Sequence, residues 1–390
     1  MNNLACFLAK IIRAQLYKEP LPEIPEGITV EQVVTIACEN QMIYMIVSAL
    51  LQMKVDDKLE PVLKQLVFKS MSKTLMQVNE LKALQQAFEE SGIVNQPMKG
   101  SVMRFIYPKP ELREMGDIDI LVNEIDIKRA QETLEQLGYV CESEGRQHDV
   151  YRKKPHMCVE VHKAMFDKHL DNNQYEYFKD ISKRELRMGC QYTYDFSKED
   201  YYVYMMAHMA KHFYVKGCGI RNLIDVYVYK ERFAKEMNWE YVNAELEKCG
   251  IRDYTEHMER LAQIWLGEEE STPFYNHLFD YMMNSGIHGK TENSIWAMVA
   301  REQQARENVT RFQVMLWNFF PTYEYMVKWF NWLEGRRYLL PVAWGIRAFR
   351  GVFMRKRLRQ RENAVNLSEQ DIQIYGEIYR KVKLPFDDKN

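Results

Sequence analysis

Gly116-Asp117-Ile118-Asp119-Ile120-Leu121-Val122 places two carboxylates two residues apart at the start of a run of strong strand formers. Because side chains on a strand alternate between its faces, Asp117 and Asp119 should share one face while Ile118 and Ile120 point into a core. Asp-x-Asp also occurs in Asx turns and solvated loops. Two convergent carboxylates, however, suit a hard divalent cation such as Mg²⁺, which takes oxygen ligands and keeps positions for water and phosphate. The stretch therefore predicts a strand and favours phosphoryl or nucleotidyl transfer.

The residues around this stretch predict a small sheet inside a largely helical protein. Strand signals occur at 93–99, 117–122, 138–140, 150–152 and 158–162, with helical segments from Gly100 and at about 126–137. Both flanks have helical periodicity, so the fold class is α+β with a small mixed sheet. We divide the chain into an N-terminal helical region, an α/β core, a helical domain on the substrate side, and a C-terminal helical region with a basic segment: 1–90, 91–167, 168–270 and 271–390.

The bulk composition is that of an ordinary globular protein. The chain has 390 residues, 46% hydrophobic and 28% charged, with a net charge of −2, which gives no overall sign of nucleic-acid binding. The seven cysteines are scattered, without the short spacing of a zinc site, which indicates reduced thiols and a cytoplasmic protein. No signal-peptide pattern or window of about 20 apolar residues predicts export or a membrane span.

The segment 335–361 is locally basic, with aromatic residues interleaved. Such a helix could lie on an anionic membrane or bind nucleic acid. It could also be a terminal helix with one packed face and one solvated face. The second interpretation is favoured because no lipidation signal accompanies the segment.

Lys99-Gly100-Ser101 falls at a predicted strand-to-helix turn. Glycine lets the backbone approach a ligand closely, and the N–H groups that open a helix attract phosphate. Ser101 could add a hydroxyl donor. The alternative is a plain strand–turn–helix connection.

Glu160 and Arg113 could complete the site. Glu160 should share a strand face with His162, and it completes a triad of acids if its strand lies beside 117–122. Three acids can hold two metal ions. Arg113 could clamp phosphate oxygens. The alternatives are a solvent-facing strand residue and a solvated loop charge.

His208 and His212 are one helical turn apart and share a face, a geometry that can bind a transition metal. A full zinc site needs further ligands, and no His-Glu-x-x-His pattern is present here. A structural or pocket-lining pair is therefore favoured. Asp225 is expected to form an ion pair with Arg221 or His208.

Together these motifs resemble the nucleotidyltransferase superfamily, in which a Gly-Ser turn precedes a strand with Asp-x-Asp and a later strand with a third acid. Within it, the chain resembles a family of uncharacterised bacterial nucleotidyltransferases often found near cell-surface polysaccharide genes. Two features differ from the superfamily pattern: Lys99 stands where many members have an apolar residue, and the interval from Gly100 to Asp117 is longer. The resemblance covers roughly residues 90–230 and rests on Lys99-Gly100-Ser101, Arg113, Gly116 to Val122, Gly138-Tyr139, Val159-Glu160-Val161-His162, His208, His212, Gly219, Arg221 and Asp225.

The resemblance implies a metal-dependent enzyme. Asp117, Asp119 and Glu160 would be catalytic and would bind Mg²⁺ or Mn²⁺, and Gly100 and Ser101 would hold nucleotide phosphates with help from Lys99 and Arg113. The expected reaction transfers a nucleoside monophosphate from an NTP to a hydroxyl or amine of a sugar, sugar phosphate, other small molecule or protein. The candidates for the substrate pocket are His162, His208, His212, Arg221 and Asp225.

Two other functions are weighed against this enzyme. The same fold could serve as a non-catalytic nucleotide-binding or antitoxin-like module, although the presence of all three acids and the Gly-Ser turn argues against it. A metal-dependent hydrolase centred on His208 and His212 is the third possibility.

Overall fold

The computed structural model describes residues 1–53, 55–167, 172–179, 184–289, 316, 320–353 and 369–384. Four helices precede the sheet: α1 (Asn3–Tyr17), α2 (Val30–Glu39), α3 (Ile43–Leu50) and the 31-residue α4 (Glu60–Glu90). Helix α2 begins at a capping box in which Thr29 and Gln32 satisfy each other's backbone N–H groups.

A five-stranded mixed sheet follows, so the predicted α+β class is confirmed. The strand order is β1-β2-β5-β4-β3, with β2 and β5 parallel and the other pairs antiparallel. The strands are β1 (Asn95–Pro97), β2 (Ile118–Val122), β3 (Val140–Ser143), β4 (His148–Lys153) and β5 (Met157–His162). Between them lie α5 (Gly100–Met103), the 3-10 helices η1 (Pro110–Leu112) and η2 (Glu124–Asp126), and α6 (Ile127–Gln136).

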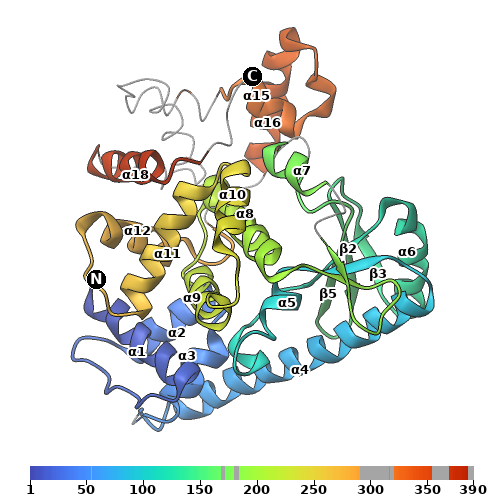
Figure 1. Ribbon diagram of the computed structural model, residues 1–390. Helices are drawn as coiled ribbons and strands as arrows, with labels where there is room; N and C mark the ends of the chain where they lie inside the picture. The colour runs from blue at the N-terminus through green and yellow to red at the C-terminus, as the bar shows by residue number, and fades with distance from the viewer. Residues whose placement is uncertain are drawn as a thin grey trace.

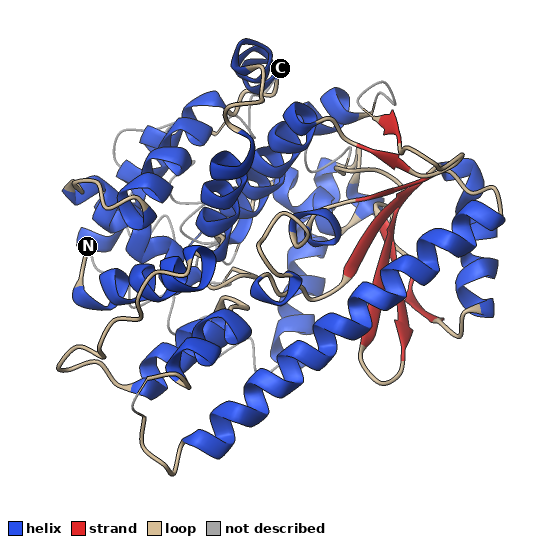
Figure 2. Cartoon of the chain, turned by 60° about the horizontal axis from the view of Figure 1, so that its bottom comes forward, coloured by secondary structure: helices blue, strands red, loops and turns tan. Residues whose placement is uncertain are grey.

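One face of this sheet is buried against α4 and α6. Ile118, Ile120 and Val122 of β2 pack with Leu84 and Phe88 of α4 in one core cluster. Figure 2 shows the long α4 passing across the sheet. The alternation predicted for 117–122 thus places Asp119 on the opposite face, toward the helical part of the molecule.

The helices after the sheet share a large hydrophobic core with α1–α3. Trp265 of α11 packs on Phe279 of α12 and donates a hydrogen bond to the carbonyl of Ala5 in α1. Figure 1 shows these helices gathered on the other side of α5 from the sheet. They are α8 (Lys198–Lys216), α9 (Arg221–Phe233), α10 (Trp239–Lys248), α11 (Arg252–Leu266) and α12 (Pro273–Ser285).

The remaining elements are shorter. Helix α7 (Asn172–Phe178) and the two-stranded sheet of β6 (Glu185–Leu186) and β7 (Tyr194–Asp195) connect the main sheet to α8. Helices α15 (Tyr323–Trp329) and α16 (Leu340–Phe353) form a small core of their own, and α18 (Glu369–Val382) contacts α11 and α12. The short η4 (Asn331–Leu333) and η5 (Arg337–Leu339) lie between α15 and α16.

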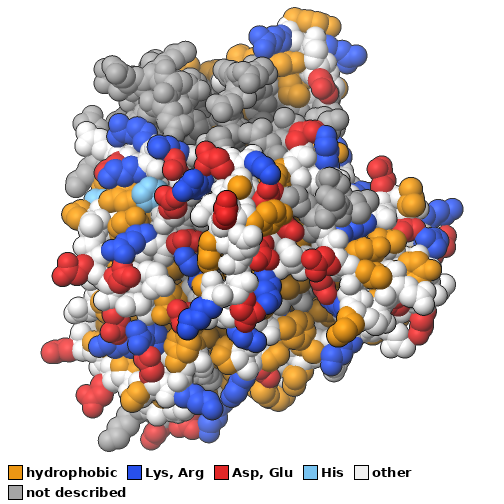
Figure 3. Space-filling model, in the orientation of Figure 1, with side chains coloured by type: hydrophobic (Ala, Val, Ile, Leu, Met, Phe, Trp, Pro, Cys, Tyr) orange, Lys and Arg blue, Asp and Glu red, His pale blue; other side chains and the backbone are white. Residues whose placement is uncertain are grey.

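Helix α16 carries part of the basic segment 335–361, of which 354–361 lie outside the described residues. Within the described ranges, none of the helices combines the length and apolar character needed to cross a bilayer. Acidic and basic side chains are interspersed over the face seen in Figure 3.

Candidate active site

The parallel pairing of β2 with β5 brings the predicted acids together. Asp119 and Glu160 are register partners on neighbouring strands, and Asp117 lies just before β2. Burial together with the charges of Asp119 and Glu160 raises the pKa of Asp117 to about 7. Burial works to raise the pKa of Asp119 too, but the charge of Lys99 and a hydrogen bond with His162 outweigh it and hold that pKa below its usual value.

Lys99 is the cation of this group of acids. Its Nζ lies 2.6 Å from Oδ1 of Asp119 and 4.0 Å from Oε2 of Glu160. The backbone of Lys99 has φ 47°, an uncommon value for a residue with a side chain, and its carbonyl accepts a hydrogen bond from Tyr201 of α8. The structure therefore places Lys99 against the carboxylates, at the point where the chain turns from β1 into α5.

The Gly100-Ser101 turn is built by close packing. A Cβ on Gly100 would lie 2.5 Å from Nη1 of Arg113 and 3.0 Å from Cβ of Met115, so any other residue here would require its neighbours to shift. Helix α5 has four residues and therefore little helix dipole for a phosphate. Ser101 is 3% exposed, its hydroxyl has no hydrogen-bond partner among the described residues, and it lines a second cavity of about 440 Å³ beside Pro97.

Arg113 lies in the protein interior rather than on a solvated loop. Its guanidinium forms two contacts with Asp225 of α9, at 2.9 Å and 3.3 Å, and Tyr107 donates to the same carboxylate at 2.8 Å. The expected pairing of Asp225 with Arg221 or His208 is therefore wrong. Arg221 instead donates to Gln41 and to the carbonyl of Glu114, at 2.6 Å and 3.0 Å.

These buried polar contacts hold the loop that leads into β2. Arg113 and Glu114 belong to the loop that leads into β2, and α9 holds that loop through Asp225 and Arg221. The interval between Gly100 and Asp117 is longer than the superfamily pattern. It contains η1 and also Arg113, which forms the ion pair with Asp225.

His162 and His148 lie beside Glu160. Nε2 of His162 is 2.9 Å from Oδ1 of Asp119 and 3.4 Å from Oε2 of Glu160. His148, on β4, is the register partner of His162, and its Nε2 is 3.8 Å from Oε1 of Glu160. Sequence reasoning missed His148. The signal that could have found it is the tight turn at Lys154-Pro155-His156, because a hairpin about that turn pairs His148 with His162.

His208 and His212 lie on α8 with their Nε2 atoms 3.1 Å apart. Burial, followed by the positive charges of His212 and Lys99, keeps the pKa of His208 well below its usual value. Tyr201 of the same helix donates a hydrogen bond to the carbonyl of Lys99 at 2.8 Å, so α8 packs against the turn that carries Lys99. Within the described part of the chain, the group of three or more metal-ligating side chains is His148, Glu160 and His162, and it includes neither residue of the α8 pair.

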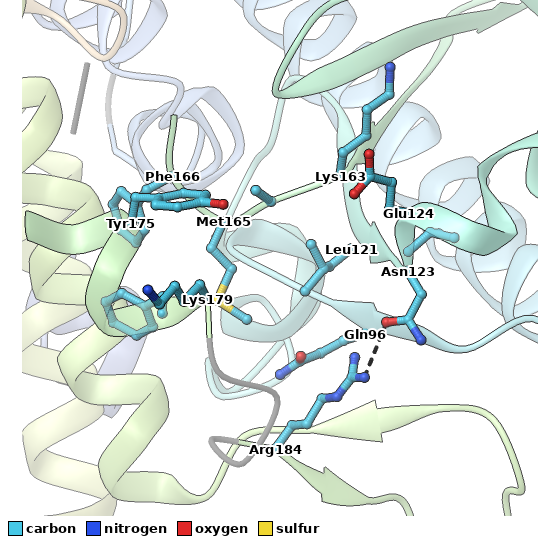
Figure 4. A pocket seen from close by; sticks show the side chains of 13 residues that line it. Gln96, Leu121, Asn123, Glu124, Lys163, Met165, Phe166, Tyr175, Lys179 and Arg184 are labelled. Atoms are coloured by element: carbon cyan, nitrogen blue, oxygen red, sulfur yellow. Dashed lines mark hydrogen bonds between the residues drawn. The ribbon is translucent and has the colours of Figure 1, made fainter. Parts of the chain in front are cut away.

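A pocket of about 280 Å³ (Figure 4) lies at the C-terminal ends of β2 and β5, and its lining does not include Asp117, Asp119 or Glu160. Leu121, two residues after Asp119 on the same strand face, lines it. Gln96 of β1 is the register partner of Leu121, is fully buried, and has no hydrogen-bond partner for either amide atom among the described residues. Figure 4 shows Gln96 beside Arg184, which donates to Asn123 at 3.2 Å.

The pocket has more basic than acidic side chains. Lys163, Lys179 and Arg184 line it together with Glu124. The aromatic rings of Phe166 and Tyr175 form the part of the wall opposite Gln96. Sequence reasoning did not identify this pocket, because its lining comes from β1, the ends of β2 and β5, and α7.

A comparison with known families agrees with the fold. The chain belongs to a family described as uncharacterised nucleotidyltransferases, whose model matches residues 26–267. The match runs from before α2 to just past α11 and includes the whole sheet. It supports nucleotidyl transfer from an NTP as the general chemistry. No curated protein and no solved structure matches the chain.

Proposed function

We propose that the protein transfers a nucleoside monophosphate from an NTP to a hydroxyl or amine of a small acceptor and releases pyrophosphate. The observation that carries this proposal is the register pairing of Asp119 with Glu160, with Asp117 alongside, in a member of a nucleotidyltransferase family. Those carboxylates lie on the sheet face opposite the α4 and α6 core.

The three carboxylates fit a divalent cation. Their oxygens are the donors that Mg²⁺ or Mn²⁺ takes, and the position of Lys99 indicates that positive charge is stabilised there. When bound, such an ion would neutralise phosphate oxygens of the transferring group. Asp117 and Asp119 would hold it, and Glu160 would complete the metal site or accept a proton from the acceptor hydroxyl.

Lys99 would have two partners in turn. Without substrate, its ammonium group neutralises Asp119. With a metal on the carboxylates, the ammonium group would be displaced and could donate to the triphosphate. The Ser101 hydroxyl is buried and Ser101 lines the second cavity, so a contribution to phosphate binding would come from the turn backbone.

The pocket beside Leu121 supports a small acceptor. The unpartnered amide of Gln96 can both donate to and accept from sugar hydroxyls or base edges. Arg184 and Lys179 favour an anionic group, as in a sugar phosphate. None of the seven cysteines, all of which lie in the described part of the chain, forms a disulfide, which suits a reducing, NTP-containing cytoplasm.

Pyrophosphate release with each NTP, Mg²⁺ and a panel of sugars and sugar phosphates tests the proposal. Asp119→Asn keeps the side-chain shape but removes a ligand charge, and we expect turnover to be lost. Glu132→Gln, an exposed carboxylate on α6, is the matched control and should keep full turnover. Full activity of the Asp119→Asn variant would contradict the assignment.

The non-catalytic alternative gives a different result. A binding module would bind an NTP without Mg²⁺, with an affinity unchanged by Asp117→Ala and Asp119→Ala. Isothermal titration with and without Mg²⁺ separates the two functions.

A further inference from the structure

The β4–β5 hairpin brings two imidazoles and a carboxylate to one point. His148 lies directly opposite His162, and Glu160 is two residues before His162 on β5, so all three share a face of the sheet. Their ligand atoms all lie within 4.8 Å of one another, and the two imidazole rings are 5.0 Å apart.

We propose that His148, Glu160 and His162 bind a divalent transition-metal ion of the zinc class, distinct from the Mg²⁺ held by carboxylates alone. Imidazole nitrogens favour zinc, copper, iron and nickel ions, whereas Mg²⁺ prefers oxygen donors. Two histidines and one glutamate, with a fourth position open, are a donor set that catalytic zinc sites use. The inference rests on the proposed function only in that Glu160 belongs to both sites.

The ligand atoms lie near the spacing that such an ion needs, and binding would draw them closer together. Ligands about 2.0–2.2 Å from a tetrahedral zinc lie about 3.3–3.6 Å from one another. Oε2 of Glu160 is 3.4 Å from Nε2 of His162, Oε1 of Glu160 is 3.8 Å from Nε2 of His148, and one ligand atom from each residue can be chosen so that all three lie within 4.8 Å of one another. The side chain of His148 is 35% exposed, so it has room to move toward the other two ligands and an ion can reach it.

The neighbours of the cluster connect it to the transfer site. Nε2 of His162 also faces Asp119 at 2.9 Å and Nζ of Lys99 at 3.5 Å. A cation on the hairpin would hold Glu160 and His162 in place and add positive charge next to Asp119. The site would then pair a hard ion on the aspartates with a transition-metal ion on the hairpin.

Zinc binding by the full-length chain without a polyhistidine tag tests the proposal. Cys6 and Cys38 are exposed thiols that could bind zinc themselves, so both are replaced by Ser in the starting protein. Equilibrium dialysis with metal analysis should give one equivalent of Zn²⁺, and visible absorption of Co²⁺ should report the same site. Excess Mg²⁺ should not displace either ion.

His148→Ala and His162→Ala should each weaken zinc binding by more than about tenfold, because even loss of an outer partner of a metal ligand costs 10–100-fold. His156→Ala is the matched control, since His156 is exposed in the turn of the same hairpin. Circular dichroism of each variant shows whether it folds, and His148→Gln provides a milder change if His148→Ala does not fold. Absent zinc binding, or binding unchanged in the His148 and His162 variants, would overturn the proposal.

Asp119→Asn separates this inference from the proposed function. That variant should lose NTP turnover and keep its zinc. Zinc binding by a protein that lacks NTP turnover under every condition would leave this site standing and contradict the transferase proposal. NTP turnover without zinc binding would support the transferase proposal and overturn the zinc site.

Discussion

Replacing Asp225 by Ala should strongly destabilise the fold. The side chains of Arg113 and Asp225 are 8% and 5% exposed, so the change leaves a buried guanidinium without its carboxylate. Breaking a buried ion pair in this way costs about 3–5 kcal/mol. Tyr107 also loses its acceptor, which adds about 1–3 kcal/mol for an unpaired buried group and overlaps in part with the first term. We expect a loss of about 4 kcal/mol in the free energy of unfolding.

Urea denaturation followed by tryptophan fluorescence measures this loss. The control is Glu256→Ala, which removes an exposed pair with Arg252 at 3.1 Å and should cost less than about 1 kcal/mol. The double variant Arg113→Met with Asp225→Leu should recover most of the stability, because apolar side chains of similar size often replace a buried pair without loss.

A loss below about 1 kcal/mol in Asp225→Ala would refute this reasoning. Arg113 would then not depend on Asp225, and it would be free to clamp phosphate as the motif analysis predicts. A double variant as unstable as Asp225→Ala would show that packing rather than charge determines the cost.

Three further predictions follow from single sites. Gly100→Ala should cost about 1–3 kcal/mol in urea unfolding because its Cβ meets Arg113, whereas Gly116→Ala, with 3.6 Å of space, should cost under about 0.5 kcal/mol. The pKa of Asp117 is raised from 3.8 to about 7, so its contribution to stability is fully present below pH 3.8 and is lost as pH rises to about 7, by at most about 1.4 kcal/mol per pH unit. Unfolding with EDTA at pH 5 and pH 8 should show this loss in the native protein and not in Asp117→Asn. Gln96→Leu should raise stability by about 1–3 kcal/mol, because it removes an unpartnered buried amide, and should raise KM for the acceptor in the pyrophosphate assay; unchanged KM would exclude Gln96 from the acceptor pocket.

Local patterns were sufficient for the strands that carry the acids. The alternation at 117–122 and 158–162 predicted β2 and β5 to within one residue, because burial on one face imposes a period of two. The strand expected near 93–99 is confined to Asn95–Pro97. Lys99, two residues after this strand, has a positive φ. Nothing about a lysine side chain predicts that backbone conformation.

Contacts between distant segments were beyond such patterns. The local sequence indicates that Arg113 is a solvated loop charge. Its partner Asp225 lies on α9, 112 residues further along the chain. Asp225 likewise has Arg221 one helical turn away, and nothing local shows that Arg113 outcompetes it. From its sequence context Gln96 is an ordinary polar strand residue. Only the pocket that it lines together with α7 and residues 163–166, which follow β5, shows that it is buried in a pocket wall.

The sequence by itself determined the kinds of donor atom and the strand faces that carry them, because side-chain alternation is a property of the local backbone. Asp117, Asp119 and Glu160 could therefore be named before any fold was known. The tertiary structure alone decided which of those side chains lie beside one another on the sheet. The parallel register of β2 with β5 sets Asp119 beside Glu160, and the antiparallel register of β4 adds His148. Register depends on hydrogen bonds and packing between segments far apart in the chain, so no single stretch of residues specifies it.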